Sequence, residues 1–170
     1  KAVIAASGWG VSDDDAQVHA QDTIVGGCYL NDPSIVARIA QHAKSEVAFL
    51  RDCGVRFDME NDRPRVMQTP GHRYARHVYG ENWVGRDLVF PLMHHAAQMG
   101  IEFRAHVFVS RLLVSDNRIS GAAGISRDNR FIVFKARAVV LATGGYAQIY
   151  LNTNNAPGIT GDGHALAYAA

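Results

Sequence analysis

The chain has 170 residues, of which 48% are hydrophobic and 19% are charged, so it can bury a core and is not typical of a disordered protein. Its formal net charge of +1 gives no basic surface of the kind that nucleic-acid binding needs, so no nucleic acid is expected as a partner. No apolar run reaches the roughly 18 residues of a membrane-spanning helix and no signal-peptide pattern opens the chain, which indicates a cytoplasmic protein.

This length is typical of one domain, and we expect residues 1–170 to form a single domain. Lys1 is not a natural start, and Ala170 interrupts an alanine-rich helix. The sequence is therefore expected to be part of a longer protein.

The first predicted element is a helix between Asp32 and Gly54. The Asp32 side chain can accept hydrogen bonds from the first free N–H groups, and the fixed φ of Pro33 suits the first turn. Apolar residues then recur on one face of the helix, and Gly54 provides the stop. These residues are Ile35, Val36, Ile39, Ala40, Ala43, Val47 and Leu50. Residues 58–79 follow without a sustained period, and we expect a long functional or mobile loop there.

A second helix is predicted over residues 85–99, with Pro91 either near its first turns or kinking it. Three partly alternating segments come next, joined by short Asp-Asn loops of the type that connects antiparallel strands. The segments are 106–115, 118–126 and 130–135. They predict a β-meander.

The meander is expected to lead into a buried strand at residues 138–142, because the apolar run there is continuous, as in a mostly parallel sheet. Gly144 and Gly145 then allow a sharp turn without a Cβ clash. Further on, Thr160-Gly-Asp-Gly precedes an apolar run and predicts a helix start whose N–H groups and acidic side chain face a polar ligand. These features are how α/β folds bring main chain close to a nucleotide.

Two cysteines, Cys28 and Cys53, could form a disulfide, but in a reducing compartment we expect both to be buried thiols. The eight histidines raise the question of a metal. However, adjacent histidines on a helix point about 100° apart, and no Cys-x-x-Cys or His-Glu-x-x-His spacing occurs. No metal site is expected.

Ordered segments along nearly the whole chain resemble the succinate dehydrogenase and fumarate reductase flavoprotein family, which includes L-aspartate oxidase. Members carry a phrase close to V-L-A-T-G-G-A-G-x-x-Y-x-x-T-T-N and then T-G-D-G-x-A-M-A. The matching residues here are Val140 to Gly145, Tyr150, Thr153, Asn154 and Thr160 to Gly163. The segment starting at Gln21 is similar to the family's D-T-x-x-G-x-x-x-x-D, and residues 71–86 resemble its G-G-H-S-x-x-R segment and the following helix.

The resemblance implies an α/β fold, namely a partial Rossmann-like FAD-binding domain with an antiparallel β-meander and flanking helices. The chain would be the middle portion of that domain. It would lack the N-terminal phosphate loop, since no G-x-G-x-x-G occurs in it, and the substrate-capping domain. In succinate dehydrogenases a histidine near the position of Ala2 is joined covalently to the flavin, so the resemblance implies that FAD binds here without a covalent bond.

The resemblance also assigns cofactor contacts. Small residues at 6–10 would let main chain lie against a flat ring, although an ordinary tight turn is the alternative. Asp162 would lie against the flavin or would only cap a helix. Thr143 and its glycines would offer donors or would only end a strand, and Val109 resembles the position that meets adenine, though a strand valine needs no ligand. The full set is Ala6, Ser7, Gly8, Trp9, Gly10, Val109, Ala142, Thr143, Gly144, Gly145 and Asp162.

His72 and Arg76 match the G-H-S-x-x-R segment and are expected near the substrate. With Arg73 and His77 they could attract a dicarboxylate, because arginine binds carboxylates in a bidentate fork, or they could belong to a solvated loop. The residues that relatives use for catalysis lie downstream of Ala170, so no catalytic residue is expected in this chain.

The resemblance implies a fragment of a flavoprotein subunit that interconverts succinate and fumarate with FAD, as in electron transport and the tricarboxylic acid cycle. A C4 dicarboxylate would be the substrate. An iron–sulfur subunit would be the partner, through which the protein could be peripheral on the inner face of the cell membrane. L-aspartate oxidase is one alternative, and a cofactor-binding fragment without catalysis is another. The isolated chain is expected to be inactive.

Overall fold

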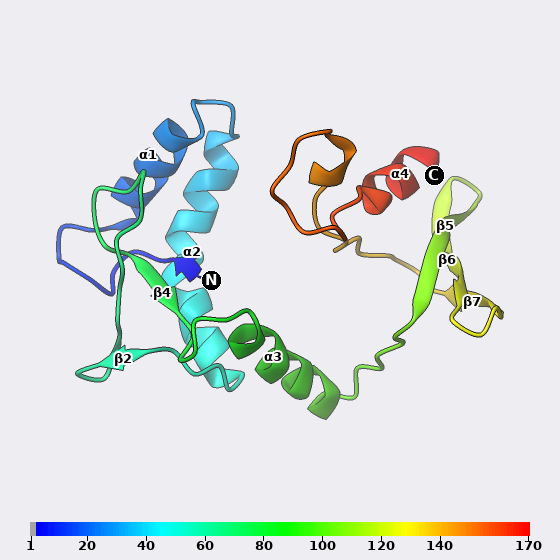
Figure 1. Ribbon diagram of the computed structural model, residues 1–170, viewed down its shortest axis with the longest axis horizontal. Helices are drawn as coiled ribbons and strands as arrows, with labels where there is room; N and C mark the ends of the chain where they lie inside the picture. The colour runs from blue at the N-terminus through cyan, green and yellow to red at the C-terminus, as the bar shows by residue number, and fades with distance from the viewer. Residues whose placement is uncertain (1–2) are drawn as a thin grey trace. The chain divides into compact units, whose positions relative to one another are not determined.

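The computed structural model describes residues 3–170, and the chain divides into two compact units, Lys1–Glu102 (unit 1) and Phe103–Ala170 (unit 2). Helices and strands occur in both units, as Figure 1 shows, so the predicted α/β class is confirmed. The sequence predicts a single domain, whereas the structure has two units, each with its own contacts.

Helix α2 (Pro33–Asp52) lies where the sequence predicts a helix. Asp32 caps it, since Oδ1 accepts from the N–H groups of Ser34 at 2.8 Å and Ile35 at 3.4 Å. Just beyond its end, Gly54 has a φ of +93°, a left-handed conformation that suits glycine. The buried face is Val36, Ala40, Ala43 and Val47. Ile35 and Ile39, which were predicted on that face, are exposed, because both lie to one side of the buried stripe, Ile35 about 110° and Ile39 about 70° around the helix from its centre.

Two short strands, β1 (Val3–Ala5) and β4 (His77–Tyr79), pair antiparallel in unit 1. Val78 of β4 and Ala6, which follows β1, pack with Val47 of α2 in the hydrophobic core. The predicted long loop at 58–79 is therefore wrong in part. It contains β4 and two further strands of two residues each, β2 (Met59–Glu60) and β3 (Arg63–Pro64), which are too short to show an alternating pattern.

Helix α1 (Ala16–Gly26) was not predicted. Its cap is Asp15, which accepts a hydrogen bond from the Val18 N–H at 2.8 Å. The buried residues of this helix are His19 and Asp22, so its inward face is polar. The recurring apolar residues that predict a helix with an apolar inward face are therefore absent from α1.

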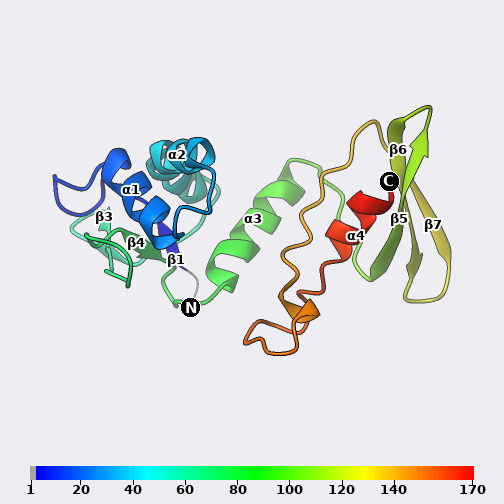
Figure 2. The ribbon, with the colours of Figure 1, turned by 90° about the horizontal axis from the view of Figure 1, so that it is seen from above.

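Helix α3 (Arg86–Gln98) confirms the second predicted helix and contains Pro91. In unit 2, strands β5 (Val107–Ser115), β6 (Arg118–Ser126) and β7 (Phe131–Lys135) form one antiparallel sheet in the order β5-β6-β7 (Figure 2). The turn between β5 and β6 has Asp116 and Asn117 at φ of +50° and +61°, as a tight hairpin requires. The predicted β-meander is confirmed.

The buried strand predicted at residues 138–142 is wrong. These residues belong to no helix or strand, and Val140 is 89% exposed. The apolar run has the composition of a core strand, but a strand forms only beside a hydrogen-bonding neighbour, and no described strand pairs with it. A 3₁₀ turn, η1 (Ala147–Ile149), and helix α4 (Asp162–Ala169) follow, and α4 confirms the predicted helix start.

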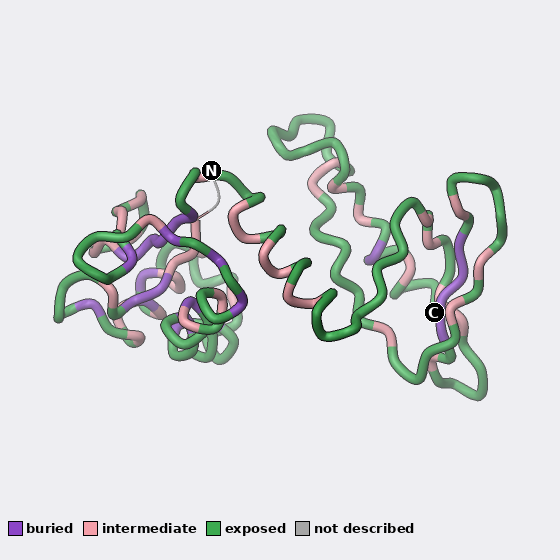
Figure 3. The backbone as a smooth tube through the Cα atoms, turned by 90° about the horizontal axis from the view of Figure 1, so that it is seen from below, coloured by how far each residue is buried: buried purple, intermediate pink, exposed green. Residues whose placement is uncertain are grey.

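Burial is concentrated in unit 1 and, within unit 2, mainly along β6 (Figure 3). Both cysteines are free thiols, and Cys53 is buried as expected. Cys28 is exposed, so the prediction that it is buried is wrong. It lies in the turn after α1 with a φ of +51°, where no core surrounds it.

We predict that Val47→Ala will lower the free energy of unfolding by about 2 kcal/mol, because it leaves a cavity at a side chain with no exposed surface. Val25→Ala is the control, since Val25 is 50% exposed and its truncation should change stability by less than about 0.5 kcal/mol. Urea unfolding of both variants measures the difference, and equal losses would contradict the assignment of Val47 to the core.

Candidate functional site

The glycine-containing loop at residues 6–10 follows β1 in unit 1. The Ala6 N–H donates to the Arg76 carbonyl at 2.9 Å, and Ala6 and Ser7 are buried. Gly8 has a φ of +86°, and a Cβ at Gly10 would lie 2.7 Å from the Ala75 carbonyl oxygen. Small residues are thus required here by packing within the protein, so the alternative of an ordinary tight turn remains open beside the cofactor role.

The aromatic ring of Trp9 in this loop lies near a cationic side chain of α2. Lys44 Nζ of α2 lies 5.3 Å from the centre of the Trp9 ring, within range of a cation–π interaction. The Trp9 Nε1 atom is buried and has no hydrogen-bond partner in the described part of the chain. A buried donor without an acceptor is uncommon, and it makes the loop a candidate for contact with a further group.

Arg76, one of the two residues predicted near the substrate, is completely buried. Its Nη2 lies 2.7 Å from Asp14 Oδ1 and 2.9 Å from Asp22 Oδ2, and its Nε donates to Asp14 Oδ2 at 3.2 Å. The alternative of a solvated loop is therefore wrong for Arg76. Its charge is already balanced by two carboxylates, so a bidentate fork on a ligand is not free to form without a rearrangement.

His72, the other predicted residue, is partly buried beside Arg76. Its Nδ1 lies 3.1 Å from Arg76 Nη1, and its ring packs edge-on against His77, with ring centres 4.6 Å apart. His77 is buried, and the Thr69 hydroxyl oxygen lies 3.2 Å from its Nδ1. The structure thus gathers His72, Arg76 and His77 into one cluster. Arg73 joins its edge, because Arg73 Nε lies 2.6 Å from Asp22 Oδ1.

Burial and the charge of Arg76 shape the ionisation of this cluster. Burial, followed by the Arg76 charge, lowers the pKa of His19 to about 4. The same two causes lower the pKa of His72. Burial also lowers the pKa of His77, with smaller effects from His72 and Arg76. Because protonation would add a cation beside a buried guanidinium, these imidazoles are neutral near pH 7.

The acidic members are held in their charged form. Burial acts to raise the pKa of Asp22, but hydrogen bonds from the backbone and side chain of Arg73, with the charge of Arg76, outweigh it and the pKa is lowered. Sequence reasoning missed Asp14, His19 and Asp22. A usable signal was present for two of them, because His19 and Asp22 are three residues apart in the helix that Asp15 caps, a spacing that places both on one face.

In unit 2, the segment 143–146 packs against the start of α4. A Cβ on Gly163 would collide with Oγ1 of Thr143, and a Cβ on Gly161 would lie 2.9 Å from Cβ of Tyr146. The intervening loop is closed by Gln148, whose N–H donates to the Ile159 carbonyl at 2.9 Å. Two glycine motifs that are far apart in the sequence are therefore side by side, and we name this contact the glycine corner, comprising residues 143–146 and 160–163.

Asp162 is the first residue of α4 and is exposed. The residue at the cap position is Gly161, with a φ of +83°, and the carboxylate of Asp162 accepts instead from the Thr160 hydroxyl at 2.5 Å. The alternative that Asp162 only caps the helix is not what the structure shows. Gly144 has a φ of +76°, and no atom lies within 4 Å of where a Cβ would stand, so its face is open.

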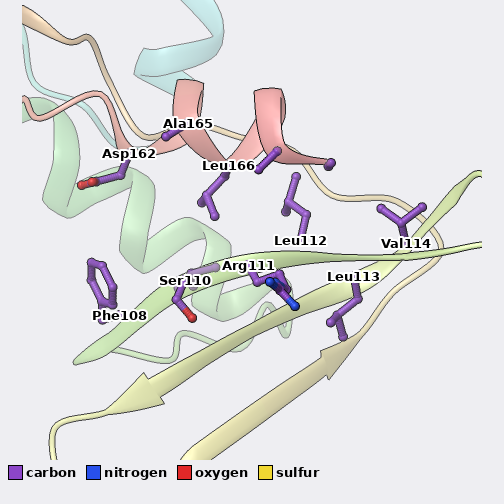
Figure 4. A pocket seen from close by; sticks show the side chains of 12 residues that line it. Phe108, Ser110, Arg111, Leu112, Leu113, Val114, Asp162, Ala165 and Leu166 are labelled. Carbon is purple, nitrogen blue, oxygen red and sulfur yellow. The ribbon is translucent and has the colours of Figure 1, made fainter.

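A cleft of about 640 Å³ lies between β5 and α4 within unit 2. Val109 and Asp162, both predicted cofactor residues, line it, and Leu112 extends toward α4 (Figure 4). Ala142, Thr143, Gly144 and Gly145 do not line this cleft. Thr143 lies beside Asp162 through the glycine corner, where it packs on Gly163, whereas Ala142 is exposed and lies outside that corner.

Ala2, the position compared with a covalently bound histidine, lies outside the described residues. Over residues 3–170, no group of three or more His, Cys, Asp or Glu side chains is placed to hold a metal ion. Of the helices that the structure describes, none has the length and apolar character needed to cross a bilayer.

The family model for an FAD binding domain matches residues 1–170. The chain is 32% identical over 161 residues to a fumarate reductase (CoM/CoB) subunit of Methanothermobacter marburgensis, covering 93% of this chain and 29% of that protein. It is 32% identical over 173 residues to L-aspartate oxidase of Vibrio cholerae, covering 92% and 32%. The chain thus spans less than a third of the length of these curated relatives.

Solved structures give the same picture. Mycobacterium smegmatis Sdh1 in complex with UQ1 superposes with a TM-score of 0.85 at 32% identity, covering 96% of this chain and 30% of that one. E. coli quinol fumarate reductase superposes with a TM-score of 0.87 at 24% identity, covering 98% and 29%, which supports the fold alone.

The α/β fold and the match to an FAD binding domain over residues 1–170 place the chain in the flavoprotein class. The chain belongs to the FAD-binding domain family of flavoprotein oxidoreductases, in the group that contains succinate dehydrogenase and fumarate reductase flavoproteins and L-aspartate oxidase.

We predict that Arg76→Met will destabilise the protein by about 3–5 kcal/mol, because it leaves Asp14 and Asp22 buried without their cation. The matched control is Arg73→Met. The Arg73 side chain is 55% exposed, so losing its pair with Asp22 should cost only about 1 kcal/mol. Chemical unfolding compares the two, and similar losses would contradict the central role of Arg76.

We also predict that the free energy of unfolding falls as the pH is lowered from about 6.5 to about 4. His19 has a pKa of about 4 when folded and an ordinary value of 6.5 when unfolded, so the unfolded chain binds the extra proton in this range. A difference of one in pKa between the folded and unfolded states corresponds to about 1.4 kcal/mol. Unfolding measured against pH should give a shallower slope for His19→Gln than for His42→Gln, a substitution at an exposed position of α2. Equal slopes would contradict the prediction.

Proposed function

We propose that this chain is part of the flavoprotein subunit of a succinate dehydrogenase or fumarate reductase. The observation that carries the proposal is the glycine corner. The Thr-Gly-Gly turn at 143–145 and the Thr-Gly-Asp-Gly turn at 160–163, both shared with the family, pack on each other through Thr143 and Gly163. The similarity to the fumarate reductase of Methanothermobacter marburgensis supports the same proposal.

The residues present fit FAD. Gly144 presents an open main-chain face at a φ of +76°, and the carboxylate of Asp162 stands exposed beside the same corner. In unit 1, the loop at 6–10 brings a buried Trp9 N–H without an acceptor. Such groups suit a ligand with many polar acceptors, donors and a flat ring.

In this proposal, the loop 6–10 and the residues of the glycine corner each contact FAD, which binds without a covalent bond. The amides of Gly144 and Gly145 and the hydroxyl of Thr143 would donate hydrogen bonds to FAD, and the carboxylate of Asp162 would accept hydrogen bonds from it. Val109 would contact the adenine. When bound, FAD supplies hydride transfer to and from a C4 dicarboxylate. The chain is the middle portion of the FAD-binding domain, and the phosphate loop and substrate-capping domain belong to the rest of the protein.

The proposal extends to location and partner. The electrons would pass to an iron–sulfur subunit, and the protein would be cytoplasmic, held at the membrane through such partners. These statements follow from the resemblance to complex-forming members of the family, as does the expectation that the isolated chain does not turn over substrate.

A second candidate function is L-aspartate oxidase. It is favoured by the 32% identity to the Vibrio cholerae enzyme, which is equal to the identity with the fumarate reductase of Methanothermobacter marburgensis. The two candidates differ in substrate, which is a C4 dicarboxylate with or without an amino group.

We predict that succinate, and not L-aspartate, will reduce the flavin of the FAD-loaded full-length protein, and that fumarate will reoxidise it. Anaerobic flavin absorbance measures both directions. Reduction by L-aspartate alone would support the second candidate. If neither succinate nor L-aspartate bleaches the flavin of a protein that holds FAD, the leading proposal is refuted. The protein would then bind the cofactor without catalysing either reaction.

We further predict that Gly163→Ala will weaken FAD binding by at least tenfold, because the new Cβ collides with Thr143 and separates the two turns of the glycine corner. Gly158→Ala is the control, since no atom lies within 4 Å of the position its Cβ would take. Flavin fluorescence titration of the full-length apoprotein measures both. Unchanged affinity in a folded Gly163→Ala protein would remove the glycine corner from the cofactor site.

A further inference from the structure

The contact between Arg76 and His72 fixes where the imidazole proton lies. Arg76 Nη1 is 3.1 Å from His72 Nδ1. A guanidinium has only donors, so Nδ1 must be the acceptor and carries no proton. In a neutral imidazole the proton is then on Nε2. The tautomer of His72 thus follows from the identity of its neighbour.

Arg76 is itself held in place, so the contact is not incidental. The guanidinium has no exposed surface, and two buried carboxylates, Asp14 and Asp22, lie within 2.9 Å of its Nη2. Rotating Nη1 away from His72 would disturb both ion pairs in a buried environment, where a broken pair is costly.

The surroundings also favour neutral His72 over its cation. The charged and titratable groups around it come from the segment before α1, from α1 and from the segment that contains β4. They are Asp14, His19, Asp22, Arg73, Arg76 and His77. The two carboxylates are balanced by the two guanidinium groups, so no excess negative charge favours protonation. Burial and Arg76 lower the pKa of His72.

The opposite nitrogen is available. His72 is partly exposed, and among residues 3–170 no side chain or carbonyl accepts a hydrogen bond from its Nε2. A neutral imidazole whose Nε2–H faces no protein acceptor can donate to an oxygen of a ligand without changing its own charge.

We propose that His72 is a fixed hydrogen-bond donor, through Nε2–H, to a carboxylate oxygen of the substrate, and that Arg76 is the positioning residue that sets this tautomer. The ligand class rests on the proposed function, which names a dicarboxylate. The tautomer rests only on the geometry of this chain. In this role His72 donates a hydrogen bond and neither supplies nor removes a proton.

The test is nitrogen NMR of the ¹⁵N-histidine-labelled, FAD-loaded full-length protein, with His72 identified by the signal that disappears in His72→Gln. The expected spectrum shows a proton on Nε2, a titration midpoint below 6.5, and a shift of the Nε2 signal on addition of succinate. A proton on Nδ1, or a midpoint at or above the ordinary value, would overturn the inference. These readings are made on the wild-type protein, and only the assignment of the His72 signal uses the His72→Gln variant.

A variant pair tests the donor role. The amide nitrogen of His72→Gln can replace Nε2–H without titrating, whereas His72→Leu cannot donate. We expect the dissociation constant for succinate to rise about tenfold or more in His72→Leu and to be largely restored in His72→Gln. Equal losses in the two variants would overturn the donor role.

The failure of the proposed function is distinguishable from that of the inference. If the enzyme turns over succinate but the His72 signal does not move, the proposed function stands and the inference is wrong. If the flavin is reduced only by L-aspartate, the proposed substrate is wrong. In that case, a His72 signal that shifts with L-aspartate supports the carboxylate-donor role, and an unmoved signal overturns it.

Discussion

The buried guanidinium of Arg76 is the constraint on which unit 1 depends. A cation without solvent must be paired, and its partners Asp14 and Asp22 come from the segment before α1 and from α1 itself. The Arg76 carbonyl also accepts from Ala6, so the same residue ties the loop at 6–10 to β4. One residue therefore connects the loop proposed to contact the cofactor with His72, which is proposed to contact the substrate. The inward face of α1 is polar because Asp22, which is buried on that face, pairs with the Arg76 guanidinium.

In unit 2, the glycine corner depends on close packing against glycines rather than on the pairing of buried charges. Thr143 packs into the space that a side chain at Gly163 would fill, and Tyr146 packs in the same way against Gly161. Two turns that are separated along the chain therefore contact each other. This contact leaves the main chain at Gly144 open and places Asp162 at its edge. The arrangement suits the binding of a nucleotide, because main-chain donors can approach a ligand only where no Cβ intervenes.

Sequence reasoning succeeded where one physical signal dominated. The cap at Asp32, the stop at Gly54 and the Asp-Asn turns of the meander are local, so α2 and the β5-β6-β7 sheet could be predicted. It failed at residues 138–142, where an apolar run was taken for a strand although a strand also needs a neighbour. It failed at α1 for the opposite reason, since the inward face of that helix is polar. Cys28 is exposed because it lies in the turn after α1, and no local sequence pattern predicted that turn.

By itself, the sequence determined the class of fold, the local turns and the segments shared with a flavoprotein family, because these depend on residues close together in the chain. The motif at 71–76 was visible in the same way. Only the tertiary structure decided what its residues do. In the sequence, Arg76 is a candidate cation for a ligand, yet folding pairs it with Asp14 and Asp22, 62 and 54 positions earlier, and leaves His72 partly exposed beside it. The physical reason is that burial and charge pairing are set by distant residues.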